Sequence, residues 1–211
     1  MSTCSVIVPT WNRAKLLPKA LASIYGQDSC PWDLEVIVID DGSTDGTVEM
    51  VKQEWGSVKL IELPRTGKPG LVRNAGIEQS TGEFIAYLDS DDFWLPHHLV
   101  TANAYFERNP TAHLVSNHWM SVHRKGNILK PIRRNFNPTP NTNCHVHRRG
   151  ILGSLVGFNE KQWGEDGDFF GQIAASFFTI RTGVVTSVNC YVQDGNNITY
   201  HYCPDIKSAF R

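Results

Sequence analysis

Apolar residues in the first ninety positions follow two alternating patterns. Four short runs, three of them apolar at nearly every position, predict strands: Ser5–Val8, Leu34–Ile39, Val58–Leu63 and Phe84–Leu88. Apolar residues at helical spacing predict three helices between them: Leu16–Ile24, Val48–Trp55 and Leu71–Gln79. Continuous apolar runs are typical of strands buried on both faces, as in a parallel sheet. The alternation therefore predicts βαβ units with right-handed crossovers.

The second half of the chain has a less regular pattern. Its apolar spacing predicts four elements: a helix over His97–Asn109, a strand over Leu114–His123, a helix over Gly164–Ser176 and a strand over Val184–Val192. Between Arg124 and Arg149, Pro, Asn, His and basic residues replace the apolar pattern, which predicts a long loop or a mobile segment. Its basic side chains either meet an anionic group, such as a diphosphate, or form a solvated loop face.

Composition excludes several classes of protein. The chain has 211 residues, of which 41% are hydrophobic and 19% charged, so it is too apolar to be disordered. The formal net charge of −1 argues against nucleic acid or an anionic membrane as a partner. No apolar run approaches the ~20 residues that cross a bilayer, and residues 1–10 do not resemble a signal peptide. We expect a cytoplasmic protein without a transmembrane segment.

The five cysteines are widely spaced and form no CxxC pair, which indicates reduced thiols rather than a disulfide scaffold. Cys144, His145 and His147, together with His201 and Cys203, carry side chains that zinc can use. Their spacing matches none of the usual structural zinc patterns, so scattered loop or core residues are the favoured interpretation. Trp94, Trp119 and Trp163 are either sugar-stacking or core residues.

Polar segments follow three of the predicted strands: Pro9–Asn12, Asp40–Asp41 and Asp89–Asp92. Ligands of parallel α/β sheets collect at the carboxyl ends of the strands, so we expect a site there. Three carboxylates within residues 89–92 repel one another unless a cation lies among them, and Mg²⁺ or Mn²⁺ suits such oxygen ligands. The alternative is that they end the strand and cap a helix. Taken alone, Asp40–Asp41 slightly favours a structural turn over a contact with a nucleotide base.

Five segments, taken in order, resemble family 2 glycosyltransferases of the A-type fold. They are Ser5–Arg13 (SVIVPTWNR), Val36–Thr47 (VIVIDDGSTDGT), Arg73–Gly76 (RNAG), Thr81–Asp92 (TGEFIAYLDSDD) and Gly164–Phe169 (GEDGDF). The resemblance implies one Rossmann-like α/β domain over residues 1–211, with a mostly parallel central sheet flanked by helices and a small C-terminal acceptor-side portion. Residues 1–95 would bind the nucleotide-sugar, and residues 96–211 would form the acceptor side.

The resemblance also implies roles for single residues on the donor side. Pro9, Thr10 and Asp41 match positions that hold the nucleotide base, with Asp41 at the base edge. Arg73 would fix the base or the phosphates. Asp89-Ser90-Asp91 matches the DxD motif: Asp89 and Ser90 would contact the nucleotide-sugar, and Asp91 would bind Mn²⁺ or Mg²⁺. Metal and arginine would then neutralise the departing nucleoside diphosphate.

On the acceptor side, Glu165-Asp166 matches the acidic pair whose Asp is the general base. One base and direct displacement imply inversion at the anomeric carbon through an oxocarbenium-like transition state. Acidic residues at a helix N-terminus are the structural alternative, and Asp168 is the reserve candidate for the base. The implied reaction moves a sugar from a UDP-sugar to a hydroxyl of a glycan or other acceptor.

One feature departs from the family pattern. Members often carry a His near the place where this chain has Asp194, which leaves the third metal ligand open. Two other functions stay as alternatives. Asp89-Ser90-Asp91 also resembles the nucleophile motif of haloacid-dehalogenase phosphotransferases, although that motif follows the first strand there and the fourth strand here. A non-catalytic nucleotide-sugar binding domain is the second alternative.

Overall fold

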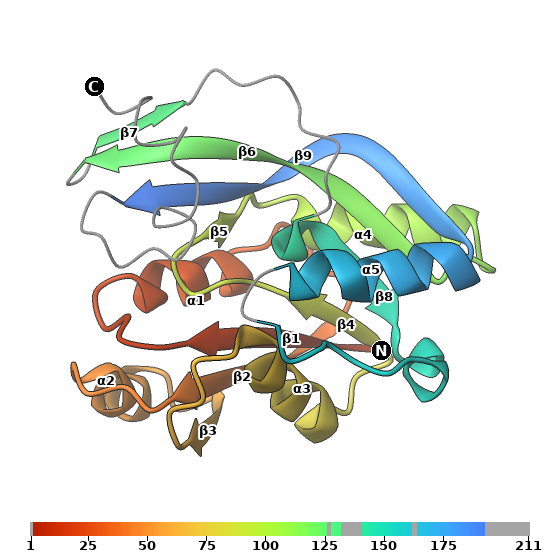
Figure 1. Ribbon diagram of the computed structural model, residues 1–211. Helices are drawn as coiled ribbons and strands as arrows, with labels where there is room; N and C mark the ends of the chain where they lie inside the picture. Colours follow the sequence, from red (N-terminus) through yellow and green to blue (C-terminus); the bar gives the residue numbers. More distant parts are fainter. Residues whose placement is uncertain (1, 126–127, 132–140, 162–163, 193–211) are drawn as a thin grey trace.

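The computed structural model describes residues 2–125, 128–131, 141–161 and 164–192 (Figure 1). Its strands are β1 (Thr3–Thr10), β2 (Asp33–Asp41), β3 (Lys59–Leu63), β4 (Phe84–Tyr87), β5 (Phe93–Trp94), β6 (Leu114–Lys125), β7 (Ile128–Pro131), β8 (His145–Arg148) and β9 (Thr179–Val192). Its α-helices are α1 (Leu17–Tyr25), α2 (Thr47–Glu54), α3 (Pro69–Gln79), α4 (His98–Arg108) and α5 (Glu165–Ser176). Two short 3₁₀ helices complete the list: η1 (Thr142–Cys144) and η2 (Arg149–Ser154).

One sheet connects the strands in the order β3-β2-β1-β4-β8-β6-β9-β5, with β7 paired to β6. The first four of these are parallel, as the continuous apolar runs predict, and the α/β fold is confirmed. Beyond β4 the directions are mixed, because β8 is antiparallel to both β4 and β6 whereas β9 is parallel to β6. Figure 1 shows β6 and β9 as long strands above the parallel part of the sheet.

Helices cover both faces of the sheet because the parallel strands are apolar on both sides. Val6 and Val8 of β1 pack in one core with α1 and α4, whereas Ile7 packs in a second core with α3 and α5. The pleat of a strand sends successive side chains to opposite faces, which gives this division. In Figure 1, α3 and α5 lie in front of the strands that they cover.

Helix α3 lies very close to the sheet at Gly76. A Cβ atom added there would lie 2.6 Å from Cδ1 of Ile39 and 2.7 Å from Cγ2 of Ile7. Only a residue without a side chain fits this approach, so Gly76 sets the distance between α3 and strands β1 and β2. By contrast, a Cβ at Gly171 in α5 would meet no atom within 4 Å.

The prediction of a long loop over Arg124–Arg149 is wrong for residues 141–149. Residues 145–148 form β8 in the middle of the sheet, and both histidines of this strand are buried. Burial lowers the pKa of His145 to about 3 and that of His147 to about 4, so both rings are neutral at pH 7. The sequence pattern counts them as polar, which hides the strand.

The basic residues at the end of this segment have internal partners. The Arg148 guanidinium pairs with Glu83 at 3.1 Å, and Nε of Arg149 donates to the Gly82 carbonyl at 2.7 Å. These contacts favour a structural role over anion binding for both residues. Residues 124–125 belong to β6 and residues 128–131 form β7, so the loop prediction is wrong there as well. The rest of the predicted basic loop, at 126–127 and 132–140, lies outside the described residues.

Cys144, His145 and His147, which the sequence offers as possible zinc ligands, are buried side chains of the core. Sγ of Cys144 lies 3.2 Å from Oγ of Ser187, and the hydroxyl of Tyr87 donates to Nε2 of His147 at 2.8 Å. His201 and Cys203 lie outside the described residues, as does Trp163. Trp94 is a core residue, since it is buried and its indole N–H donates to the Asn143 carbonyl at 2.9 Å.

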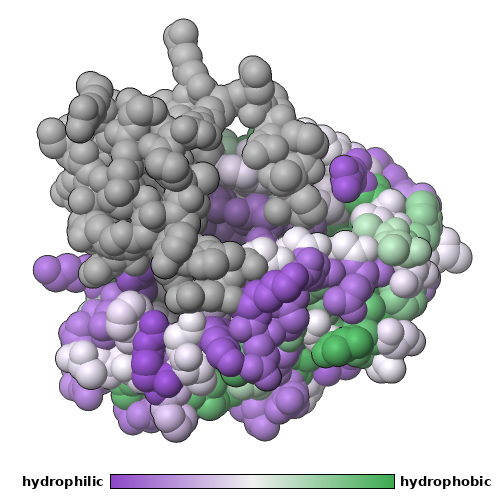
Figure 2. Space-filling model, viewed as in Figure 1, coloured by the Kyte–Doolittle hydropathy of each residue, from purple (hydrophilic) through white to green (hydrophobic). Residues whose placement is uncertain are grey.

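The outer surface is mainly polar. In the view of Figure 2, hydrophilic and neutral side chains cover most of the described surface, with separate hydrophobic areas between them. The large exposed hydrophobic residues among those described are Tyr25, Met120, Val156 and Phe178. Within the described ranges, no helix is long and apolar enough to cross a membrane.

Candidate active site

The polar residues that follow β1, β2 and β4 lie at one edge of the sheet, because parallel strands end together there. Pro9 and Thr10 are the last residues of β1. Thr10 is buried, and its Oγ1 has no hydrogen-bond partner among the described residues. A buried hydroxyl without a partner is costly, so Thr10 is available to a ligand at this edge.

Asp41, the last residue of β2, is buried and accepts several hydrogen bonds from the segment that follows β3. Its carboxylate pairs with the guanidinium of Arg65 and accepts backbone N–H groups from Thr66 at 2.6 Å and Gly67 at 3.0 Å. The Arg65 guanidinium in turn lies over the ring of Trp11, 3.8 Å from its centroid. Arg65 therefore lies beside Asp41 at the predicted base site, although the sequence analysis names only Pro9, Thr10 and Asp41 there.

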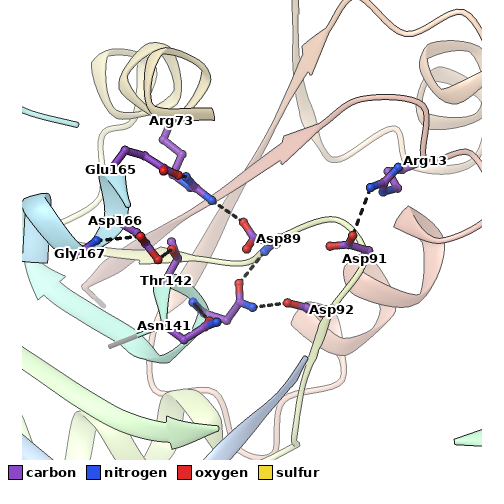
Figure 3. Close-up of polar contacts among 11 residues, drawn as sticks. Arg13, Arg73, Asp89, Asp91, Asp92, Asn141, Thr142, Glu165, Asp166 and Gly167 are labelled. Carbon is purple, nitrogen blue, oxygen red and sulfur yellow. Dashed lines mark hydrogen bonds and ion pairs between the residues drawn. The ribbon is translucent and has the colours of Figure 1, made fainter. Parts of the chain in front are cut away.

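Arg73 of α3 lies between two carboxylates from distant parts of the chain. Its Nη2 donates to Oδ1 of Asp89 at 2.7 Å, and its Nη1 donates to Oε1 of Glu165 at 2.7 Å (Figure 3). Burial lowers the pKa of Arg73, but the two carboxylates outweigh this effect and raise it above the ordinary value. Burial raises the pKa of Glu165, against the opposing charge of Arg73.

The other acidic residues after β4 have partners of their own. Oδ2 of Asp91 lies 3.2 Å from Nη2 of Arg13, and only 17% of the Asp91 side chain is exposed. Burial raises the pKa of Asp91, whereas Arg13 lowers it. Ser90 and Asp92 are buried. The structure thus brings Asp89 and Asp91 to the predicted edge, each paired with an arginine.

The donor set after β4 fits a hard divalent cation. Mg²⁺ is usually bound by one or two carboxylates together with phosphate oxygens, and Asp89 and Asp91 supply two carboxylates. Among the described residues, no group of three or more His, Cys, Asp or Glu side chains is arranged to hold a metal alone. Asp194, which stands near the place where family members often carry a His, lies outside the described residues.

Asp166 lies in the first turn of α5, after Gly164 in left-handed conformation. Its Oδ1 accepts the backbone N–H of Gly167 at 2.8 Å, and its Oδ2 accepts the hydroxyl of Thr142 at 3.3 Å. Figure 3 shows Asp166 next to Glu165, at the end of α5 that faces Asp89. Its partners leave the carboxylate able to accept a proton from a further hydroxyl.

Asp168, the reserve candidate for the base, has a different environment. Its Oδ2 lies 2.6 Å from Nζ of Lys161 and accepts the side-chain amide of Asn159 at 2.6 Å. The hydrogen bond from Lys161 lowers the pKa of Asp168, and 43% of the side chain is exposed. This is an ordinary surface ion pair, so the geometry favours Asp166.

Two residues of η1 lie at the site although no sequence pattern indicates them. Thr142 contacts Asp166, and Asn143 contacts both ends of the Asp89–Asp92 segment. Arg13 lies in the Ser5–Arg13 segment, from which no role for its side chain follows, yet it pairs with Asp91. A hydrogen-bond partner of Asp89 or Asp166 can come from any distant segment, so only the folded chain reveals these three.

Comparisons with known proteins find related sequences. The sequence profile described as "Glycosyl transferase family 2" matches residues 5–163. The poly(ribitol-phosphate) β-N-acetylglucosaminyltransferase TarS of Staphylococcus aureus is 37% identical over 112 residues, which are 52% of this chain and 20% of TarS. A GalNAc(5)-diNAcBac-PP-undecaprenol β-1,3-glucosyltransferase of Campylobacter jejuni is 38% identical over 139 residues, 62% of this chain and 42% of that protein. The chain therefore spans less than half the length of these relatives.

Solved structures share the fold. The crystal structure of S. aureus TarS 1–349 covers 90% of this chain at a TM-score of 0.76 and 24% identity, with 60% of that chain covered. The same protein has also been solved with UDP-GlcNAc, at a TM-score of 0.74. A mannosyltransferase of Pyrobaculum calidifontis, in complex with GDP-Man and Mn²⁺, covers 91% of this chain at 0.71 and 24% identity, with 58% of that chain covered.

Proposed function

Because the chain belongs to glycosyl transferase family 2, we propose that it moves a sugar from a nucleotide-diphospho-sugar to an acceptor hydroxyl. The donor is a UDP-sugar, the acceptor is a glycan or another hydroxyl compound, and the reaction needs Mn²⁺ or Mg²⁺. Residues 1–95 bind the donor, and residues 96–211 form the acceptor side. Family membership also leaves the haloacid-dehalogenase alternative without support.

One observation carries this proposal: Arg73 joins Asp89, after β4, to Glu165, at the start of α5. The acidic segment of the donor side and the helix that carries Asp166 therefore meet at one place. A transferase needs this arrangement, because the general base has to lie close to the bond that breaks in the donor.

On the donor side, Asp91 and Asp89 would hold the cation, which supplies charge neutralisation for the diphosphate when bound. The Thr10 hydroxyl, beside Pro9 at the end of β1, has no hydrogen-bond partner in the described part of the chain and can bind the donor. The carboxylate of Asp41 already accepts from Arg65, Thr66 and Gly67. A carboxylate has about four acceptor positions, so a base N–H shares Asp41 with this segment or replaces one of its donors.

On the acceptor side, Asp166 takes the proton of the attacking hydroxyl. As the oxygen attacks the anomeric carbon, its proton moves to the Asp166 carboxylate and the bond from the sugar to the diphosphate breaks. A single displacement on the side opposite to the leaving group inverts the anomeric carbon. Glu165 is paired with Arg73, which leaves Asp166 as the base of this acidic pair.

The choice of uridine rests on likeness to relatives. TarS has been solved with UDP and with UDP-GlcNAc, whereas the mannosyltransferase has been solved with GDP-Man. TarS also has the greater identity to a stretch of this chain, at 37% over 112 residues. We therefore favour UDP-linked donors and keep GDP-linked donors as the comparison in the test.

Calorimetric titration tests the donor class. UDP, GDP and dTDP are titrated into the folded protein with and without Mn²⁺, and we expect metal-dependent binding of UDP. Asp91→Asn should remove the gain from Mn²⁺, whereas Asp168→Asn, at the exposed pair with Lys161, should bind as the wild type does. Failure of all three nucleotides to bind contradicts the proposal. Binding without release of UDP from any UDP-sugar supports the non-catalytic alternative instead.

A further inference from the structure

The short helix η1 is a fixed turn between the two sides of the proposed site. The side-chain oxygen of Asn141 accepts the backbone N–H of Asn143 at 2.9 Å. The backbone carbonyl of Asn141 accepts the backbone N–H of Cys144 at 3.0 Å. Thr142, Asn143 and Cys144 are buried, with exposed fractions of 0–2%. Asn141 therefore caps a single turn whose next two residues point to different partners.

Thr142 contacts the proposed base. Its hydroxyl lies 3.3 Å from Oδ2 of Asp166 and is the only group of the pair that carries a proton to donate when the carboxylate is ionised. The other oxygen, Oδ1, is held by the backbone N–H of Gly167 at 2.8 Å. Two donors on different oxygens fix the rotation of the carboxylate, as Figure 3 shows.

Asn143 contacts the acidic segment after β4. Its Nδ2 donates to Oδ2 of Asp92 at 2.5 Å, and its Oδ1 accepts the backbone N–H of Asp89 at 2.7 Å. The carbonyl of Asn143 also accepts the indole N–H of Trp94. A buried amide is needed here, because it combines one donor and one acceptor. A carboxylate would face Asp92, and an apolar side chain would lose both contacts.

We propose that Thr142 and Asn143 are positioning residues, which hold the base Asp166 and the Asp89–Asp92 segment at a fixed separation. The inference rests on the proposed function. Neither side chain carries a charge, and neither needs to touch substrate. Thr142 orients the carboxylate that accepts the proton, and Asn143 shapes the segment that binds the donor. Loss of the Thr142 contact should therefore lower kcat, whereas loss of the Asn143 contact should raise the donor KM.

The test uses steady-state kinetics with the UDP-sugar from which the wild type releases UDP, in the presence of Mn²⁺. Thr142→Val keeps the shape of the side chain and removes the hydroxyl. We expect kcat to fall about tenfold, the size of a lost hydrogen bond to a charged group, with donor KM unchanged. Thr142→Ser should restore kcat. Thr81→Val is the control. It removes a hydroxyl that donates to the Glu35 carboxylate, but Thr81 precedes β4, whereas the site follows β4. We expect kcat of this variant to stay unchanged.

Asn143→Asp gives the complementary result. We expect donor KM and the Kd of UDP with Mn²⁺ to rise about tenfold, because the new carboxylate repels Asp92 and loses the N–H donor. Should this buried variant fail to fold, Thr142→Val and its Ser rescue decide the question alone. A wild type that releases UDP from no donor contradicts the proposed function. An active wild type with unchanged kcat in Thr142→Val overturns the inference, as do equal changes of kcat and KM in both variants.

Discussion

Arg73 and Glu165 form an ion pair of 2.7 Å in which both side chains are less than one tenth exposed. The pair joins α3 to the first residue of α5, and the second terminal nitrogen of Arg73 holds Asp89. Nε of Arg73 has no partner among the described residues. A buried guanidinium between two carboxylates offsets part of their negative charge, so this contact is structural as well as central to the proposed site.

Arg73→Met should therefore be costly. The substitution leaves Glu165 buried without its partner, and removal of one member of a buried pair costs roughly 3 kcal/mol in the free energy of unfolding. Urea unfolding followed by circular dichroism measures the change. The control is Lys52→Met, which breaks the exposed pair with Glu62 and should cost less than about 1 kcal/mol. Equal effects of the two variants would contradict the account.

Two glycines inside helices should respond in opposite directions to alanine. Gly76→Ala forces a Cβ against Ile39 and Ile7, and such overpacking costs about 1–3 kcal/mol. Gly171→Ala meets open space and gains helix propensity, so it should stabilise the protein by about 0.5–1 kcal/mol. Thermal unfolding of both variants compares them with the wild type, and a stabilising Gly76→Ala would disprove the close approach of α3 to the sheet.

Buried histidines should make the protein sensitive to acid. Burial lowers the pKa of His98 to about 3 and that of His147 to about 4, from an ordinary 6.5. Below pH 6.5 the unfolded chain binds protons that the folded chain refuses, so stability is full above 6.5 and falls as the pH drops toward 4. Each histidine contributes a slope of about 1.4 kcal/mol per pH unit.

Urea midpoints at several pH values between 7 and 4 measure this slope. His147→Gln removes one of these titrating groups. We expect the free energy of unfolding to change less steeply with pH, by about 1.4 kcal/mol per pH unit. A slope that does not change in the variant would show that the histidine is already protonated in the folded protein. That result would contradict its burial between Tyr87 and Arg148.

The first half of the fold could be predicted because β1, β2 and β4 are nearly continuous apolar runs. The predicted strand over Leu34–Ile39 corresponds to β2, and the predicted helix over Leu16–Ile24 corresponds to α1 with a shift of one residue. Strand β8 could not be predicted. His145 and His147 enter a sequence pattern as polar residues, but in the folded chain they are neutral and packed against Phe170 and Tyr87.

The candidate site divides in the same way. Thr10, Asp41 and Asp89 follow predicted strands, so topology alone places them together. Arg13 pairs with Asp91 across 78 positions, and Thr142 contacts Asp166 across 24. Such contacts depend on how loops fold over the sheet edge, and no local pattern in the sequence encodes them.

The central claim is that Asp166 is the general base of a sugar transfer, and the rate of that transfer in Asp166→Asn tests it most directly. The asparagine variant keeps the shape of the side chain but cannot accept the proton. We predict that the Kd of UDP with Mn²⁺ stays within about twofold, while transfer falls by about 10²–10⁴-fold. Asp168→Asn, at the exposed pair with Lys161, should transfer at nearly the wild-type rate. Full transfer by Asp166→Asn, or its loss only in Asp168→Asn, would contradict the account.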